Sequence, residues 1–180
     1  TTHEPAIVEV SGGASRVLRS SSQEHLSDDL ISAAQAVSWT SSDGETVHGF
    51  YYAPKNPEFS APEGSLPPLL VNVHGGPTSS ARPGLSIAVQ YWTSRGFAFL
   101  DVNYRGSTGY GRKYRQRLNG HWGVLDVQDC AEGAQYVVSQ GLADPQRIAI
   151  RGRSSGGYTV LSALADSDVF TAGTSLFGIG

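Results

Sequence analysis

The segment of this chain best suited to chemistry is GRSSG at residues 152–156, which matches the pattern G-x-S-x-G. A serine hydroxyl is a poor nucleophile at neutral pH, so it needs an exposed position and an adjacent base. The pattern predicts a sharp turn between a strand and a helix, with Ser154 at the apex. Glycines on both sides let the strand and the helix approach without a side-chain clash. We therefore predict that Ser154 is a nucleophile.

The residues around this motif favour the predicted turn. Ile148 and Ile150 occupy alternate positions in a short apolar run that is typical of a strand. After the serine, Val160, Leu161 and Leu164 follow at helical spacing and predict the buried face of a helix. The alternative is a glycine-rich structural turn in a chain that contains 22 glycines. The strand before the serine and the helix after it favour the nucleophile.

Attack on an acyl carbon creates an oxyanion, which two preorganised hydrogen-bond donors can stabilise. The first candidate donor is the N–H of Ser155, the residue after the nucleophile. The second candidate is the N–H of Gly76 in the sequence HGGP at 74–77, where glycines leave room for a carbonyl oxygen. An ordinary Gly-Gly-Pro turn is the alternative. His74 is expected to orient this loop, because the catalytic histidine follows the serine in this type of site.

These loops require strands that end at a common edge. Short apolar runs at 69–73, 97–102 and 147–151 predict buried strands, and residues 84–95 and 123–140 have the apolar spacing of helices. Buried strands that alternate with amphipathic helices predict a mostly parallel sheet covered on both faces. Ligands bind at the carboxyl ends of such strands. The segments that follow the three strands should therefore meet at one rim: 74–77, 103–106 and 152–154.

Further elements are expected outside these strands. Glycine turns join four predicted strands into two hairpins, 6–10 with 15–19 and 36–40 with 46–52. The second hairpin should form an antiparallel edge of the sheet, with His48 on its solvated face. The proline-rich residues 54–68 should connect this hairpin to the sheet without regular structure. A last strand is expected around residues 173–179.

Composition describes a globular chain with a core. The 180 residues are 39% hydrophobic and 16% charged, which suits one domain. The net charge of −3, without a run of Lys or Arg, argues against nucleic acid or an anionic membrane as a partner. From the sequence we expect no signal peptide and no membrane-spanning helix. Cys130 is the only cysteine and is expected to be a small buried residue, and we expect a cytoplasmic location.

Other kinds of site receive little support. Residues 103–111 are rich in glycine, but their spacing is not that of a nucleotide-binding loop and no helix is expected directly after them. Tyr104 or Arg105 in this segment should contact substrate or brace the loop. The five histidines are scattered, so we predict no metal and no other cofactor. Asp126 and Asp129 are expected on a solvated or salt-bridged helix face.

Taken together, these segments resemble the prolyl oligopeptidase family of serine peptidases, and most closely its acylaminoacyl-peptidase and dipeptidyl-aminopeptidase branch. The resemblance covers about residues 34–180 and is carried by HGGP at 74–77, NYRGSTGYG at 103–111, WG at 122–123 with Asp126 and Asp129, DP at 144–145 with Arg147, and GRSSGG at 152–157. It implies an α/β-hydrolase fold and hydrolysis of short peptides. It also implies that Ser154 is the nucleophile and that the amides of Gly76 and Ser155 form the oxyanion hole.

The resemblance also implies parts that these 180 residues do not contain. We expect residues 1–33 to be the end of a β-propeller with its connector. Residues 34–180 should be the N-terminal part of the catalytic domain, truncated after the strand that follows the nucleophile helix. No histidine follows Ser154, so the triad Asp and His are expected downstream and this piece alone is expected to be inactive. The expected partners are a peptide substrate and the missing parts of the chain.

Two alternative functions to a serine peptidase stay open at this point. A carboxylesterase or lipase of the same fold would use the same nucleophile, and the fold alone does not separate it from a peptidase. A hydrolase-like scaffold without catalysis is the other alternative. The side-chain preference, the choice between amino-terminal and internal cleavage, and the oligomeric state are not indicated by the sequence.

Overall fold

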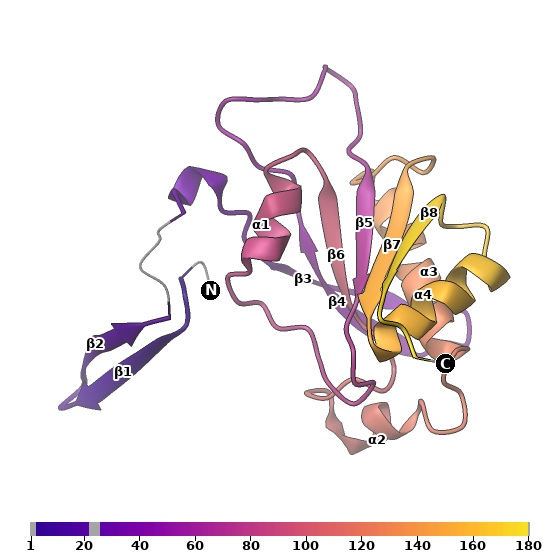
Figure 1. Cartoon of the computed structure of the whole chain (residues 1–180), viewed down its shortest axis with the longest axis horizontal. Helices are drawn as coiled ribbons and strands as arrows, with labels where there is room; N and C mark the ends of the chain where they lie inside the picture. Colours follow the sequence, from indigo (N-terminus) through magenta and orange to yellow (C-terminus); the bar gives the residue numbers. More distant parts are fainter. Residues whose placement is uncertain (1–2, 22–25, 180) are drawn as a thin grey trace.

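The computed structural model describes residues 3–21 and 26–179 (Figure 1). Its main body is a six-stranded sheet with the order β3-β4-β6-β5-β7-β8. Four neighbouring strands run parallel and the β3–β4 hairpin adds an antiparallel edge, as the sequence predicted. The strands are β3 Gln35–Thr40, β4 Thr46–Tyr52, β5 Leu69–Val73, β6 Ala98–Asn103, β7 Ile148–Arg153 and β8 Ala172–Leu176.

Helices cover both faces of this sheet. The helices are α1 Ile87–Thr93, α2 Gly111–Gln116, α3 Leu125–Ser139 and α4 Ser155–Asp166. Side chains of a strand alternate between the two faces of a sheet. Neighbouring residues of β6 therefore show which helices cover each face. Leu100 packs in the cluster under α3 and α4, and Phe99 packs in the cluster under α1. This is the arrangement of an α/β-hydrolase sheet with helices on its two sides.

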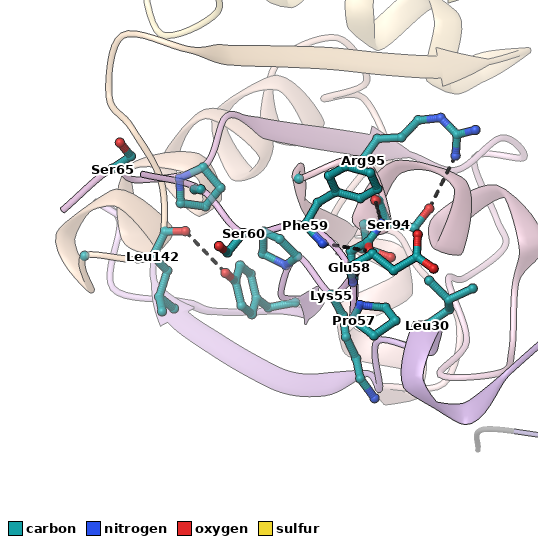
Figure 2. Close-up of a pocket in the computed structure, with 18 residues that line it drawn as sticks. Leu30, Lys55, Pro57, Glu58, Phe59, Ser60, Ser65, Ser94, Arg95 and Leu142 are labelled. Atoms are coloured by element: carbon teal, nitrogen blue, oxygen red, sulfur yellow. Dashed lines mark hydrogen bonds between the residues drawn. The ribbon is translucent and has the colours of Figure 1, made fainter. Parts of the chain in front are cut away.

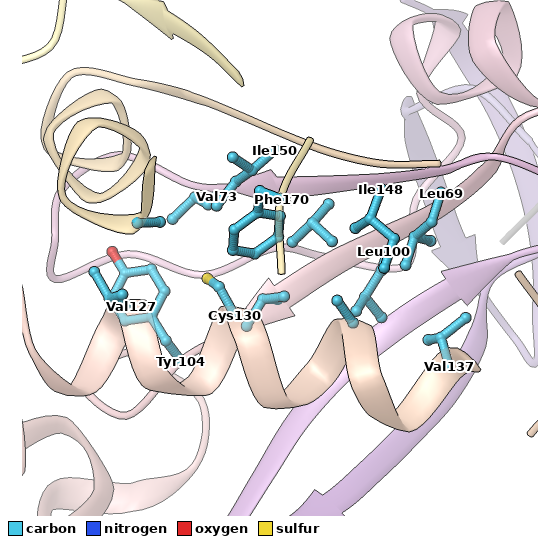
Figure 3. Packing of buried hydrophobic residues seen from close by; sticks show 14 of the residues in the cluster. Leu69, Val73, Leu100, Tyr104, Val127, Cys130, Val137, Ile148, Ile150 and Phe170 are labelled. Atoms are coloured by element: carbon cyan, nitrogen blue, oxygen red, sulfur yellow. The ribbon is translucent and has the colours of Figure 1, made fainter. Parts of the chain in front are cut away.

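The larger cluster fixes α3 against the parallel strands (Figure 3). Cys130 and Val137 of α3 are fully buried in it, together with Leu100 and Ile150 of the sheet. Cys130 is therefore the small core residue that the sequence predicted, and burial raises the pKa of its thiol. Burying a side chain such as Val137, Leu100 or Ile150 stabilises the fold by about 1.5–3 kcal/mol.

One predicted helix was too long, one helix was missed, and one predicted helix face was wrong. The helix expected over 84–95 is only α1 Ile87–Thr93, because Gly84 is a poor helix former and Ser86 has an extended backbone, with φ −128° and ψ 115°. No helix was expected directly after 103–111, yet α2 begins at Gly111; none of its side chains is buried, so it has no apolar pattern to detect. Leu161 and Leu164 are exposed on α4.

The buried face of α4 uses small residues instead of the two leucines. Gly156, Gly157 and Ala163 lie against the sheet with Val160 between them. Helix and sheet therefore approach more closely than leucine side chains would allow.

The N-terminal segment forms a separate two-stranded sheet of β1 Ala6–Ser11 and β2 Ala14–Ser20. This is the predicted first hairpin, and Figure 1 shows it beside the main body. All residues of β1 are exposed, including Ile7 and Val10. A 3-10 turn at Asp28–Leu30 follows.

In the part of the chain that the structure describes, no helix combines the length and the hydropathy that crossing a bilayer requires.

Candidate active site

Ser154 occupies the turn between β7 and α4 in a backbone conformation that residues with side chains rarely adopt. Its φ is 55° and its ψ is −124°. Such a conformation costs of the order of 1–3 kcal/mol and persists only where the surroundings enforce it. Here the N–H of Ser154 donates to Leu176 O at 3.0 Å, and its carbonyl accepts the N–H of Gly157 at 2.9 Å. The Ser154 side chain is partly exposed and makes no hydrogen bond to any described residue.

The glycines of the motif are explained by close backbone contacts. A Cβ atom on Gly152 would lie 2.3 Å from Gly156 O, and a Cβ atom on Gly156 would lie 2.4 Å from Val73 O. Both distances are shorter than any real contact between carbon and oxygen. The strand, the helix and the neighbouring β5 therefore meet at the turn only because these two positions lack side chains, as the sequence predicted.

The HGGP loop follows β5 and lies directly beside Ser154. A Cβ atom on Gly75 would be 3.4 Å from Ser154 Cβ and 3.0 Å from Arg153 O. The next residue, Gly76, has φ 138° and precedes a cis peptide bond to Pro77. A side chain is unfavourable at such a φ, and a Cβ atom there would lie 2.7 Å from Thr78 N.

The two N–H groups expected to form an oxyanion hole are both unpaired. Among the described residues, no backbone or side-chain atom accepts a hydrogen bond from the N–H of Gly76. Ser155 begins α4, so no preceding turn of that helix can accept its N–H, and no other described group accepts it. Two unpaired backbone donors therefore belong to segments next to Ser154: Ser155 follows it in sequence, and Gly76 follows Gly75, where an added Cβ would lie 3.4 Å from Ser154 Cβ.

His74 holds the HGGP loop with both ring nitrogens. Its Nδ1 lies 2.9 Å from Gly75 O, and its Nε2 lies 2.8 Å from Ser107 Oγ. A carbonyl oxygen can only accept, so Nδ1 carries the proton and Nε2 accepts from the Ser107 hydroxyl. Burial lowers the pKa of His74, against the opposing effect of its hydrogen bond to Gly75 O. This arrangement agrees with the expected loop-orienting role and leaves neither nitrogen free to serve Ser154.

Tyr104 and Arg105 brace the rim from the end of β6. The Tyr104 hydroxyl lies 3.2 Å from the carbonyl oxygens of both His74 and Pro77, and its ring stacks on His74 at 4.4 Å between centroids. Both side chains are only 1% exposed. Of the two expected roles, substrate contact or bracing, the structure shows bracing.

Arg105 makes a buried ion pair with Asp129 of α3. Its Nε and Nη2 donate to Asp129 Oδ1 at 2.9 and 2.6 Å, and its backbone N–H donates to Asp129 Oδ2 at 2.7 Å. A further ion pair joins Arg105 to Asp43 in the β3–β4 turn. Asp129 is fully buried, so the expectation of a solvated face was wrong and the salt-bridged alternative holds. Burial raises the pKa of Asp129 to about 6, against the opposing effect of Arg105.

Asp126, one turn earlier on α3, is buried as well and was not expected to be. It accepts the N–H of Gly123 at 2.7 Å and the hydroxyl of Thr159 at 2.5 Å. Thr159 lies on α4 and also contacts Ser155 O at 3.2 Å. Burial raises the pKa of Asp126, while these hydrogen bonds oppose the shift.

His48 is not the solvated strand residue that its position suggested. Its ring stacks on Tyr110 at 4.3 Å between centroids and lies 5.5 Å from Tyr114. Both tyrosines come from the α2 region, where no helix was predicted. The packing of these two rings against His48 was therefore missed. Burial lowers the pKa of the imidazole.

The described residues hold no group of three or more His, Cys, Asp or Glu that could bind a metal ion. A cavity of about 1260 Å³, shown in Figure 2, does not have Ser154 among its lining residues. It is lined by the proline-rich arm and by the turns before β6 and β7, including Phe59, Arg95 and Leu142. These residues lie at the amino ends of the parallel strands, whereas Ser154 lies at a carboxyl end.

Two solved structures are similar to this chain over almost its whole length. A puromycin-hydrolyzing peptidase of Mycobacterium tuberculosis is 47% identical with a TM-score of 0.95, over 98% of this chain and 28% of that one. An acylaminoacyl peptidase of Pyrococcus horikoshii is 30% identical with a TM-score of 0.81, over 99% of this chain and 28% of that one.

A curated relative agrees with these structures. The dipeptidyl aminopeptidase BIII of Pseudoxanthomonas mexicana is 38% identical over 112 residues, which are 62% of this chain and 16% of the relative. The chain thus spans about a sixth of the length of that relative. The sequence model of the prolyl oligopeptidase family matches residues 83–179, more than half of the chain. The matched region contains the turn at Ser154, the bracing segment 103–111 and the two buried aspartates, and so the chain belongs to the prolyl oligopeptidase family.

Proposed function

We propose that this chain is part of a serine peptidase that hydrolyses short peptides through an acyl-enzyme on Ser154. One observation carries the proposal. Ser154 stands at a positive-φ turn between β7 and α4, followed by the unpaired N–H of Ser155, and the loop that carries the unpaired N–H of Gly76 lies beside it at Gly75. Removal of one such donor typically costs about 3 kcal/mol of transition-state stabilisation.

In the proposed reaction, the Ser154 hydroxyl attacks the carbonyl carbon of a peptide bond. The carbonyl oxygen becomes an oxyanion and accepts hydrogen bonds from the N–H groups of Gly76 and Ser155. A general base takes the hydroxyl proton and then gives it to the leaving amine, and water hydrolyses the remaining ester.

We further propose that this base lies outside the 180 residues. No histidine follows Ser154 in the sequence, and both nitrogens of His74 already have partners. The resemblance to the family supports a downstream acid and histidine. On this proposal the 180-residue chain alone is inactive.

The proposed domain organisation follows the same resemblance. We assign residues 1–33 to the end of a β-propeller with its connector, and residues 34–180 to the N-terminal part of the catalytic domain. Two facts support this assignment. The similar solved chains are several times longer than this one, and the β1–β2 hairpin exposes apolar side chains such as Ile7 and Val17, which further strands would cover.

The substrate class is proposed from the relatives. Their names describe puromycin hydrolysis, dipeptidyl aminopeptidase activity and release of acylamino acids. We propose amide hydrolysis of short peptides of this general kind, of the aminopeptidase or oligopeptidase type. A carboxylesterase would share the serine turn and differ in its turnover of amides.

The test uses the full-length protein that contains these residues. A fluorophosphonate probe should label the wild type at Ser154 and should not label Ser154→Ala. The wild type should hydrolyse peptide amides, and Ser154→Ala should lose roughly six orders of magnitude in kcat. Turnover of esters without turnover of amides would establish the esterase alternative, and absence of labelling would establish a scaffold without catalysis.

A further inference from the structure

The two loops that supply the proposed oxyanion donors are both tied to one helix, α3. Asp126 and Asp129 lie three residues apart on α3, and both are fully buried. Neither residue contacts the Ser154 hydroxyl in the described structure. Each begins a short series of hydrogen bonds. The series from Asp129 ends at the HGGP loop, and the series from Asp126 ends at the first turn of α4.

The first chain of hydrogen bonds runs from Asp129 to the HGGP loop. Asp129 accepts both the guanidinium and the backbone N–H of Arg105, which fixes the segment after β6. From that segment the Tyr104 hydroxyl contacts His74 O and Pro77 O, and Ser107 Oγ contacts His74 Nε2. In sequence, Gly76 lies between His74 and Pro77, so the loop that carries its N–H is held on both sides.

The second chain of hydrogen bonds runs from Asp126 to the first turn of α4. Thr159 is 1% exposed and donates its hydroxyl to Asp126 Oδ2. The same hydroxyl lies 3.2 Å from Ser155 O, one turn earlier on α4. The other oxygen of Asp126 accepts the N–H of Gly123, so the carboxylate itself is held in place.

We propose that Asp126 and Asp129 are positioning residues, which through Thr159 and through Arg105 fix the separation between the N–H groups of Ser155 and Gly76. This inference rests on the proposed function. Hydrogen bonds to a carboxylate are about twice as strong as those between neutral groups, and a site is more precise when a rigid helix supports it. On this inference, one helix gives both loops a common support.

Displacement of the two donors would change kcat and not KM. The oxyanion forms only after attack, so displaced donors destabilise the transition state and leave substrate binding almost unchanged. A misplacement of about 1 Å in such a site can cost about a hundredfold in rate. A purely structural role would instead lower the unfolding temperature without a selective effect on kcat.

The test compares variants of the full-length protein. Thr159→Val keeps the shape of the side chain and removes its donor; it should lower kcat for a peptide amide at least tenfold, with KM within about twofold of the wild type. Thr159→Ser restores the hydroxyl and should recover kcat to within about threefold. Affinity for a peptide aldehyde, whose adduct forms an oxyanion, should fall together with kcat.

Thr93→Val provides the matched control. Thr93 is fully buried in α1 and, like Thr159, its hydroxyl contacts a carbonyl one helical turn earlier, Val89 O at 3.2 Å. Among the described residues its hydroxyl contacts only Val89 and Gln90 of its own helix, so Thr93→Val should lower the unfolding temperature and leave kcat unchanged. If Thr159→Val does not fold, Asp126→Asn replaces it in the same comparison, with Asp144→Asn, at a partly exposed position, as its control.

The outcomes separate this inference from the proposed function. An active wild type in which Thr159→Val or Asp126→Asn shows the kcat of its control would overturn the positioning role and leave the peptidase intact. A wild type that neither reacts with the fluorophosphonate nor hydrolyses amides would overturn both.

Discussion

At the scale of single residues, the site requires glycine at three positions, because a side chain there would clash or would force an unfavourable backbone conformation. Gly152 and Gly156 bring backbone atoms of β7, α4 and β5 into direct contact, and Gly76 adopts a φ of 138°. Ser154 itself bears a side chain in an unfavourable backbone conformation. The glycines are therefore the structural condition for a hydroxyl that projects from the turn.

Gly152→Ala should destabilise the protein, because the added Cβ would lie 2.3 Å from Gly156 O. We expect a loss of about 1–3 kcal/mol in the free energy of unfolding, together with slower labelling of Ser154 by a fluorophosphonate. Denaturant unfolding of the full-length protein measures the first quantity. Gly84→Ala is the control, since no atom lies within 4 Å of its added Cβ; equal stability of the two variants would contradict the steric explanation.

At the scale of elements, α3 joins parts of the chain that are distant in sequence. It packs Cys130 and Val137 into the core, and Asp129 pairs with Arg105 after β6, which also binds Asp43 in the β3–β4 turn. A buried cation with one partner removed is costly, because its charge is left without compensation.

Asp129→Asn should therefore destabilise the protein by about 3 kcal/mol or more. Asp144→Asn is the matched change at the surface, where Asp144 pairs with Arg147 three residues along the chain, and it should cost less than about 1 kcal/mol. The shift of the denaturant midpoint relative to the wild type measures both effects. Similar shifts for the two variants would show that the buried ion pair contributes no more to the free energy of unfolding than the surface pair does.

The elements with strong periodic patterns were predictable from sequence. The strands at Leu69–Val73 and Ile148–Arg153 and the helix Leu125–Ser139 have apolar positions that only one arrangement buries. The helices α1 and α2 were missed or misplaced because α1 buries few side chains and α2 buries none. Local patterns do not record whether a short polar segment becomes helical when it packs over a residue such as His48.

The candidate site was predictable in part, for the same physical reason. The turn at Ser154 and the loop at Gly76 have local signatures, since a strained turn requires glycine at fixed positions. Ser107 and Thr159 carry no such signature. Their importance comes from contacts across 33 positions of sequence in each case, to His74 and to Asp126, and such contacts exist only in the folded chain.

At the scale of the whole molecule, the described fold is the frame for one half of a catalytic site. It presents the proposed nucleophile and both proposed oxyanion donors at the carboxyl ends of the parallel strands. On the function proposed above, the acid and the base would come from residues outside these 180, and the proposed β-propeller would cover the exposed β1–β2 hairpin. Nucleophile and base would then come from different parts of the full-length sequence.

The 180-residue chain alone should therefore hydrolyse peptide amides at least about 10⁴-fold more slowly than the full-length protein, because loss of a triad member costs roughly four to six orders of magnitude. Parallel assays at equal molar concentration measure the ratio. Circular dichroism of the shorter chain verifies that it is folded before the rates are compared. Comparable rates would show that the 180 residues contain their own base.

The cavity of about 1260 Å³ beside the proline-rich arm opens at the ends of the strands farthest from Ser154. A small molecule that occupied it would leave the rim at Ser154 uncovered. On the function proposed above, that molecule and a peptide would occupy opposite edges of the sheet, and raising the substrate concentration would not displace it directly.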